Sequence, residues 1–120
     1  MKSFGRLLIA AVSVAAAGCG ASRPPPAEHL ATAIAAVHGA QVAGAQQVPK
    51  AALQLKLAEE QVAQARKMMD EGENERADYM TLRAFNDAQL AVALVREEEA
   101  RARAEEAAKQ VSGPGTEAQP

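Results

Sequence analysis

Apolar side chains recur every three or four residues along most of this chain, the spacing that gives a helix one apolar face. The pattern falls into three stretches, residues 27–46, 49–71 and 75–110, separated by short breaks. The middle stretch is the most regular, with steps of four and three between Ala51, Leu55, Ala58, Val62, Ala65 and Met69. Such a seam is typical of helices that pack along their whole length. The pattern therefore predicts an all-α fold with three helices.

The breaks predict how these helices are connected. Pro49 suits the first position of a helix, and Gly72 suits the left-handed residue that follows a helix end. Asn74 is a suitable N-cap for the third helix. The connection there is only two or three residues long, so the second and third helices must run antiparallel.

The first stretch is the weakest of the three. Gly39 and Gly44 each lower its helix propensity by up to ~1 kcal/mol relative to alanine. We expect these glycines to let a neighbouring helix approach closely. The face predicted to pack is formed by Leu30, Ile34, Val37 and Gln41.

The third stretch changes character after Val95. Residues 96–106 contain almost no large apolar side chain, whereas their helix propensity is high and Glu97 and Arg101 form a favourable pair one turn apart. These residues predict a helical extension that is surrounded by solvent. If residues 75–110 are all helical, this helix is about 54 Å long.

Composition and charge narrow the class of protein. The chain has 120 residues, of which 30 are alanine, and only 2% are aromatic. Rows of methyl side chains let helix axes approach to the close end of ~8–10 Å. We therefore predict a small three-helix bundle or an antiparallel helical hairpin with a long third helix. The 13 Lys and Arg against 15 Asp and Glu argue against nucleic acid as a partner. The single cysteine excludes an internal disulfide and a four-cysteine zinc site.

The N-terminal residues have the layout of a secretory signal peptide. Lys2 and Arg6 precede an uncharged stretch, residues 7–17, that is shorter than the about 20 residues of a membrane span. Small residues then lead to the only cysteine, Cys19. We assign the parts of the chain as follows: residues 1–18 to the signal peptide, 19–26 to a lipidated cysteine and Pro-rich tether, 27–110 to the helical domain and 111–120 to a disordered tail.

Residues 16–19, Ala-Ala-Gly-Cys, resemble the lipobox of bacterial lipoprotein precursors. The resemblance implies cleavage after Gly18 and acylation of Cys19 with two or three fatty chains, which would hold the protein on a membrane. Because Gly20 rather than aspartate follows the cysteine, it also implies the periplasmic face of the outer membrane. The alternative is an ordinary signal-peptidase site ending at Ala17, which leaves Cys19 as a free thiol.

Two motifs in the helical part resemble a known family. Residues 84–91 read Ala-x-x-Asp-Ala-x-Leu-Ala, and residues 55–65 read Leu-x-x-Ala-x-x-Gln-Val-x-x-Ala. From about residue 28 to residue 108 the chain resembles a domain-of-unknown-function family of small alanine-rich helical envelope proteins. Members are commonly lipoproteins, and some are fused to an OmpA-like peptidoglycan-binding domain. The resemblance implies a location and a shape but no activity.

Three groups of side chains resemble metal-binding sites but do not match the spacing or the usual role that such sites require. His29 and His38 are nine residues apart, whereas a metal pair on a helix needs a spacing of four. The acidic residues 70–75 place glycine third, whereas a calcium loop needs it sixth. The methionines around the same turn, Met68, Met69 and Met80, are conceivable copper(I) ligands but are more typical of core filling. We therefore expect no metal, no cofactor, no catalytic residue and little concavity for a small ligand.

Asp87 is the one charged residue within residues 84–91. We expect it to hydrogen-bond across the helix seam, to Gln61 or Gln64, and to act as a structural latch. A contact with a partner protein is the alternative role.

Together these features predict a lipid-anchored structural or interaction protein of the bacterial cell envelope that is not an enzyme and contacts another envelope protein. Residues 96–110 are a candidate surface for that contact. The alternative is a periplasmic chaperone-like or accessory module for peptides or cell-wall fragments, which needs an exposed apolar groove. Self-association is also open, with the seam from Leu55 to Met69 pairing between two copies.

Overall fold

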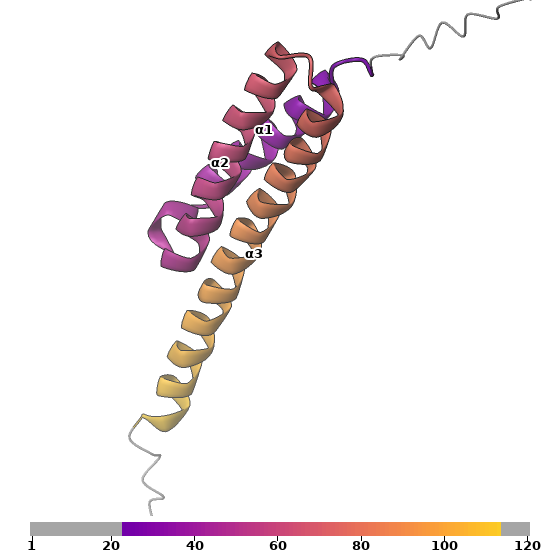
Figure 1. Ribbon diagram of the computed structural model, residues 1–120. Coiled ribbons are helices and arrows are strands. Elements are labelled where there is room, and N and C mark those ends of the chain that lie inside the picture. The colour runs from indigo at the N-terminus through magenta and orange to yellow at the C-terminus, as the bar shows by residue number, and fades with distance from the viewer. Residues whose placement is uncertain (1–22, 114–120) are drawn as a thin grey trace, which may run out of the picture.

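The computed structural model describes residues 23–113, which fold into three helices joined by short connections (Figure 1). Helix α1 spans Ala27–Val42, α2 spans Pro49–Asp70 and α3 spans Asn74–Ser112. These residues contain no strand. Helices α2 and α3 lie side by side and antiparallel, and α1 packs against both of them. The predicted all-α fold with a long third helix is therefore confirmed.

Several assignments at the chain ends lie outside the described residues. They are the signal peptide at residues 1–18 with its cleavage site after Gly18, the lipidated Cys19, and residues 114–120 of the tail. At the C-terminal end, α3 runs to Ser112, two residues beyond the predicted end at Gln110. Among residues 23–113, no helix combines the length and the apolar character that crossing a membrane requires.

The core is built mainly from methyl groups. It contains fourteen buried apolar residues within the described part of the chain, and ten of them are alanines with no exposed surface. The largest side chain that is wholly buried there is that of Thr81. Because so few bulky groups separate the helices, their backbones can approach closely and gain many weak dispersion contacts.

The predicted seam of α2 is buried within the chain. Ala51, Leu55, Ala58, Val62 and Ala65 are all buried, and Met69 is half-buried. These side chains pack against α1 and α3 of the same molecule. The seam is therefore occupied inside one copy and is not exposed for pairing with a second copy.

The face with which α1 packs shares Leu30 and Val37 with the predicted face but is turned towards Ala33 and Ala40. Ala33, Val37 and Ala40 are buried, whereas Ile34 is 36% exposed and Leu30 is half-buried. The physical reason is that α1 contacts two helices at once, so the positions nearest to both must carry small side chains. Large apolar residues alone therefore do not predict the buried face of a helix whose contacts are made mainly by alanines.

The first connection begins earlier than predicted. Helix α1 ends at Val42, four residues before the expected end, because Gly44 adopts left-handed backbone with φ 83°. A single 3₁₀ turn, Ala45–Gln47, then leads to Pro49 at the start of α2. At Gly39 an added Cβ would meet nothing within 4 Å, so the predicted close approach of a neighbouring helix there is wrong.

The second connection follows the predicted glycine chemistry but not the predicted cap. Gly72 has φ 77°, and the N–H groups of Gly72 and Glu73 donate to the carbonyls of Met69 and Met68 at 3.0 and 2.8 Å. This is the Schellman arrangement that satisfies the end of α2. Asn74 is the first residue of α3 instead of its N-cap. Its side-chain amide instead donates to the carbonyl of Arg23 at 2.6 Å, which ties the N-terminal segment to this turn.

Candidate functional site

The hydrogen bond expected at Asp87 is present. The Nε2 of Gln61 on α2 donates to Oδ2 of Asp87 on α3 at 2.7 Å. Gln61 is only 6% exposed and Asp87 is half-buried, so water competes little for this bond. Of the two partners expected for Asp87, the bond goes to Gln61. Gln64 is exposed.

The same pair leaves one polar atom without a partner. Oε1 of Gln61 is buried and accepts no hydrogen bond in the structure. Leaving a buried acceptor unpaired costs about 1–3 kcal/mol. The bond between Gln61 and Asp87 also fixes which turns of the antiparallel helices lie opposite one another, because the donor and the acceptor must stay within 3 Å.

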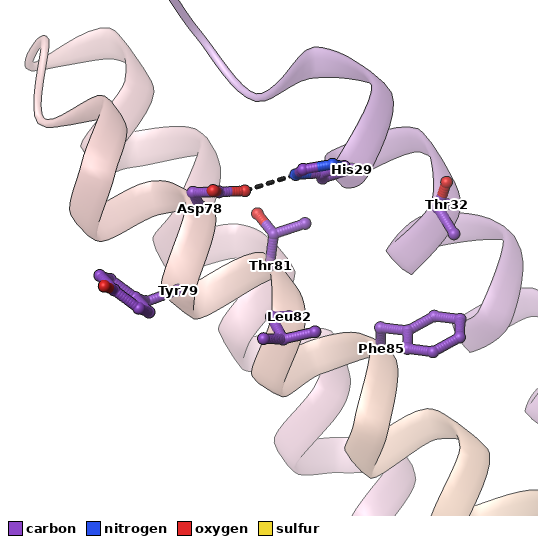
Figure 2. A pocket seen from close by; sticks show the side chains of 7 residues that line it. All are labelled: His29, Thr32, Asp78, Tyr79, Thr81, Leu82 and Phe85. Carbon is purple, nitrogen blue, oxygen red and sulfur yellow. Dashed lines mark hydrogen bonds and ion pairs between the residues drawn. The ribbon is translucent and has the colours of Figure 1, made fainter. Parts of the chain in front are cut away.

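A depression opens between the first turns of α1 and α3, at the end of the bundle where the N-terminal segment enters (Figure 2). Its volume is about 250 Å³, and it is open to solvent on one side. Seven residues line it: His29, Thr32, Asp78, Tyr79, Thr81, Leu82 and Phe85. The expectation of little concavity is therefore wrong at this end of the molecule.

The polar rim of the depression is a hydrogen bond that the sequence did not suggest. Nδ1 of His29 lies 2.5 Å from Oδ1 of Asp78, and this contact joins α1 to α3 (Figure 2). The side chain of His29 is 69% exposed and that of Asp78 is 26% exposed. Because the two residues are 49 positions apart, no local spacing could have paired them.

The rest of the lining is mostly apolar. Phe85 is half-buried and packs against the core, whereas Leu82 is 57% exposed beside it. Thr81 donates its hydroxyl to the carbonyl of Ala77 at 2.7 Å, so that hydroxyl is already used within its own helix. Tyr79 is 64% exposed, and its ring points away from α1 (Figure 2). The depression thus offers an apolar floor with hydrogen-bonding groups at one end.

The remaining candidate residues do not assemble into a site. His38 is exposed on α1, and Met68, Met69 and Met80 are half-buried around the turn between α2 and α3. No group of three or more His, Cys, Asp or Glu side chains within residues 23–113 is placed to hold a metal ion. The acidic residues of this turn include Glu73, which pairs with Arg76 in the next turn.

The end of α3 is exposed along its whole length. Residues 96–112 continue the helix beyond Val95, and every one of their side chains is exposed. Figure 1 shows this segment, called the extension below, projecting past the ends of α1 and α2. Arg101 lies 3.4 Å from Glu97 and 3.8 Å from Glu98 in the extension. The predicted solvated extension is therefore confirmed, and the pair of Glu97 with Arg101 is formed.

The geometry defines a small alanine-rich bundle of three helices with one helix much longer than its neighbours. The chain belongs to the family described as domain of unknown function (DUF4398), whose model matches residues 28–107. The match includes α2, nearly all of α1, and α3 up to the twelfth residue of the extension. Comparison with curated proteins and with solved structures finds no significant match.

Proposed function

We propose that this protein is a lipid-anchored, non-catalytic interaction protein of the bacterial cell envelope. The lipid would be carried by Cys19 and would hold the protein on the periplasmic face of the outer membrane. The sequence of residues 1–20 supports the anchor, because a short apolar stretch leads directly to a small-residue pair and the only cysteine. Two or three acyl chains would make such an anchor stable.

The observation that carries the interaction role is the exposed extension of α3. The last seventeen residues of α3 are all exposed, so packing within the chain stabilises them little. Residues 96–101 border the connection between α1 and α2, and at ~1.5 Å per residue the remaining residues 102–112 reach about 16 Å beyond it. The family match includes most of the extension, so it belongs to the domain rather than to a tail. We infer that it presents a helix face to another protein of the envelope.

In-cell crosslinking tests both parts of this proposal. A photoreactive residue is placed at Ala104, in the middle of the extension, and separately at exposed Lys56 on α2 as a matched control. We expect a discrete crosslinked species at position 104, with a mass other than twice that of the chain, that is absent at position 56. The substitution Cys19→Ser should move the protein from the membrane fraction to the soluble periplasmic fraction and abolish the crosslink to a membrane-bound partner. Equal crosslinking at both positions would remove the interaction role, and an unacylated Cys19 in the mass spectrum would remove the anchor.

The depression between α1 and α3 favours a second candidate, a chaperone-like or accessory module that binds peptides or cell-wall fragments. Its apolar floor and its volume of about 250 Å³ suit one or two apolar side chains of an extended peptide. The test is suppression of aggregation of a reduced, unfolded model protein. Leu82→Asp should abolish suppression, whereas Leu53→Asp, at a residue of the same 57% exposure on α2, should not. No suppression by the unaltered protein would count against this candidate.

A further inference from the structure

A second face of α3 has the periodicity of a helix-packing seam, and its side chains are exposed in the described part of the chain, although Glu97 and Arg101 border the start of α2. Five of its residues lie within about 40° of one another around the helix, at 100° per residue. They are Tyr79, Arg83, Leu90, Glu97 and Arg101, and all are exposed. This face, called the outer seam below, points away from the buried alanines of α3, which begin at Ala77 and end with Ala91.

The centre of the outer seam is apolar. Leu90 is 45% exposed on α3. The bond between Gln61 and Asp87 sets the register of α2 against α3. In this register, Leu57 of α2 and Leu90 of α3 lie at the same level, about one helical turn away from the bond. Leu57 is 37% exposed, so both helices present an apolar side chain at this level of the bundle.

Two side chains of opposite charge lie at equal distances along the helix on either side of Leu90. Arg83 lies seven residues before Leu90, and Glu97 lies seven residues after it. In an antiparallel pair of identical helices that cross at Leu90, each Arg83 therefore faces the partner's Glu97. Tyr79 lies eleven residues before Leu90, and Arg101 lies eleven residues after it. The same antiparallel pair therefore places the guanidinium of each Arg101 against the ring of the other copy's Tyr79. A parallel pair would instead place like charges together, which is destabilising.

We propose that a second copy of this chain docks on the outer seam, with the two α3 helices antiparallel and a twofold axis at Leu90. Each contact then occurs twice, as an isologous interface requires. Residues 96–106 of one copy then lie along residues 74–84, the first turns of α3, of the other. The pairing thereby gives the exposed extension a surface to cover. It involves no residue of the lipid anchor, so its failure leaves the proposed envelope location intact.

The test uses the full chain carrying Cys19→Ser, so that a new cysteine is the only thiol. Leu90→Cys should give a covalent dimer with a short bifunctional thiol reagent, because position 90 lies on the twofold axis. Leu82→Cys is the matched control, since Leu82 is 57% exposed on the α1 side of the same helix. Mixed chains carrying Arg83→Cys and Glu97→Cys should crosslink to each other more than to themselves, which distinguishes the antiparallel from the parallel arrangement.

Charge reversal supplies a second readout by sedimentation equilibrium. Arg83→Glu and Glu97→Arg should each weaken dimerisation about tenfold, because each breaks two symmetry-related exposed pairs. The double variant should restore the affinity of the parent chain. A monomer at all concentrations of the parent, equal crosslinking at positions 82 and 90, or no rescue in the double variant would overturn the proposal.

Discussion

The two halves of α3 have the same backbone conformation but are stabilised in different ways. Residues 74–95 bury one side chain in nearly every turn, namely Ala77, Thr81, Ala84, Ala88, Ala91 and Val95. Residues 96–112 bury none. The first half is therefore stabilised by packing against α1 and α2, whereas the second half depends on helix propensity and on ion pairs between successive turns.

The packed half explains how a solvated helix of this length can persist. Isolated helices shorter than ~12–15 residues are marginal in water because the first turn is costly to form. The extension does not have to form that first turn, since it continues a helix whose earlier turns are held by tertiary contacts. We expect its residues to open locally without unfolding the bundle, as segments with few buried contacts do.

The largest difference between the halves should come from proline. Ala88→Pro removes a hydrogen bond inside the packed half and forces its ring against the carbonyl of Ala84, which costs ~3 kcal/mol or more. We expect this variant to lose its cooperative thermal transition in circular dichroism. Ala104→Pro makes the same change in the extension and should leave the free energy of unfolding within about 0.5 kcal/mol of the parent value. A similar loss of stability in both variants would show that the extension is packed.

Overpacking should give the next largest difference. Ala88 and Ala102 lie fourteen residues apart, so they occupy the same position of the repeat, yet Ala88 has no exposed surface and Ala102 is exposed. Ala88→Leu forces three carbon atoms into a closed seam and should cost about 1–3 kcal/mol in urea unfolding. Ala102→Leu should cost nothing measurable. Equal effects would mean that the seam continues into the extension.

The polar pair inside the packed half should have an intermediate effect. Asp87→Ala leaves Gln61 buried with no hydrogen-bond partner, which should lower the free energy of unfolding by about 1–3 kcal/mol. Replacing both residues by leucine should recover most of this loss, because no buried polar group then remains unpaired. Asp78→Ala is the control. It breaks the pair with the largely exposed His29 and should cost less than about 1 kcal/mol. A single-variant loss no larger than that of the control would argue against a structural latch at Asp87.

Sequence periodicity predicted the helices well where the repeat is long. The seam from Ala51 to Ala65 and the change at Val95 were both visible, because burial repeats every three or four residues over several turns. Gly72 was predictable since few other residues adopt its left-handed backbone without strain. The hydrogen bond of Asp87 was predictable because a charged side chain within an apolar motif needs a polar partner across the seam.

The features that sequence reasoning missed depend on how distant residues meet. The buried face of α1 was predicted only in part because alanines, which carry little pattern of their own, decide the contact with two helices. The hydrogen bond of His29 with Asp78 joins residues 49 positions apart, and the depression beside it is lined by side chains of two helices that are distant in the sequence. Asn74 was expected to cap α3 because its type suits that role, but its amide is taken by the carbonyl of Arg23, a contact that only the fold creates.

The smallest expected effect concerns surface ion pairs between neighbouring helical turns, which are compared in the extension and on the packed helix α2. Arg101→Gln removes the contacts with Glu97 and Glu98 in the extension and should weaken the local helix by about 0.2–0.5 kcal/mol per pair. Amide hydrogen exchange around residue 101 should therefore quicken about twofold to fivefold at low salt, and high salt should reduce the difference. Lys56→Gln removes the contact with Glu60, at 3.9 Å, on the packed helix α2. Exchange there should follow opening of the whole bundle and should hardly change, because buried alanines rather than surface charges hold that helix. Faster exchange in α2 than in the extension would contradict the division of α3 into a packed half and a solvated half.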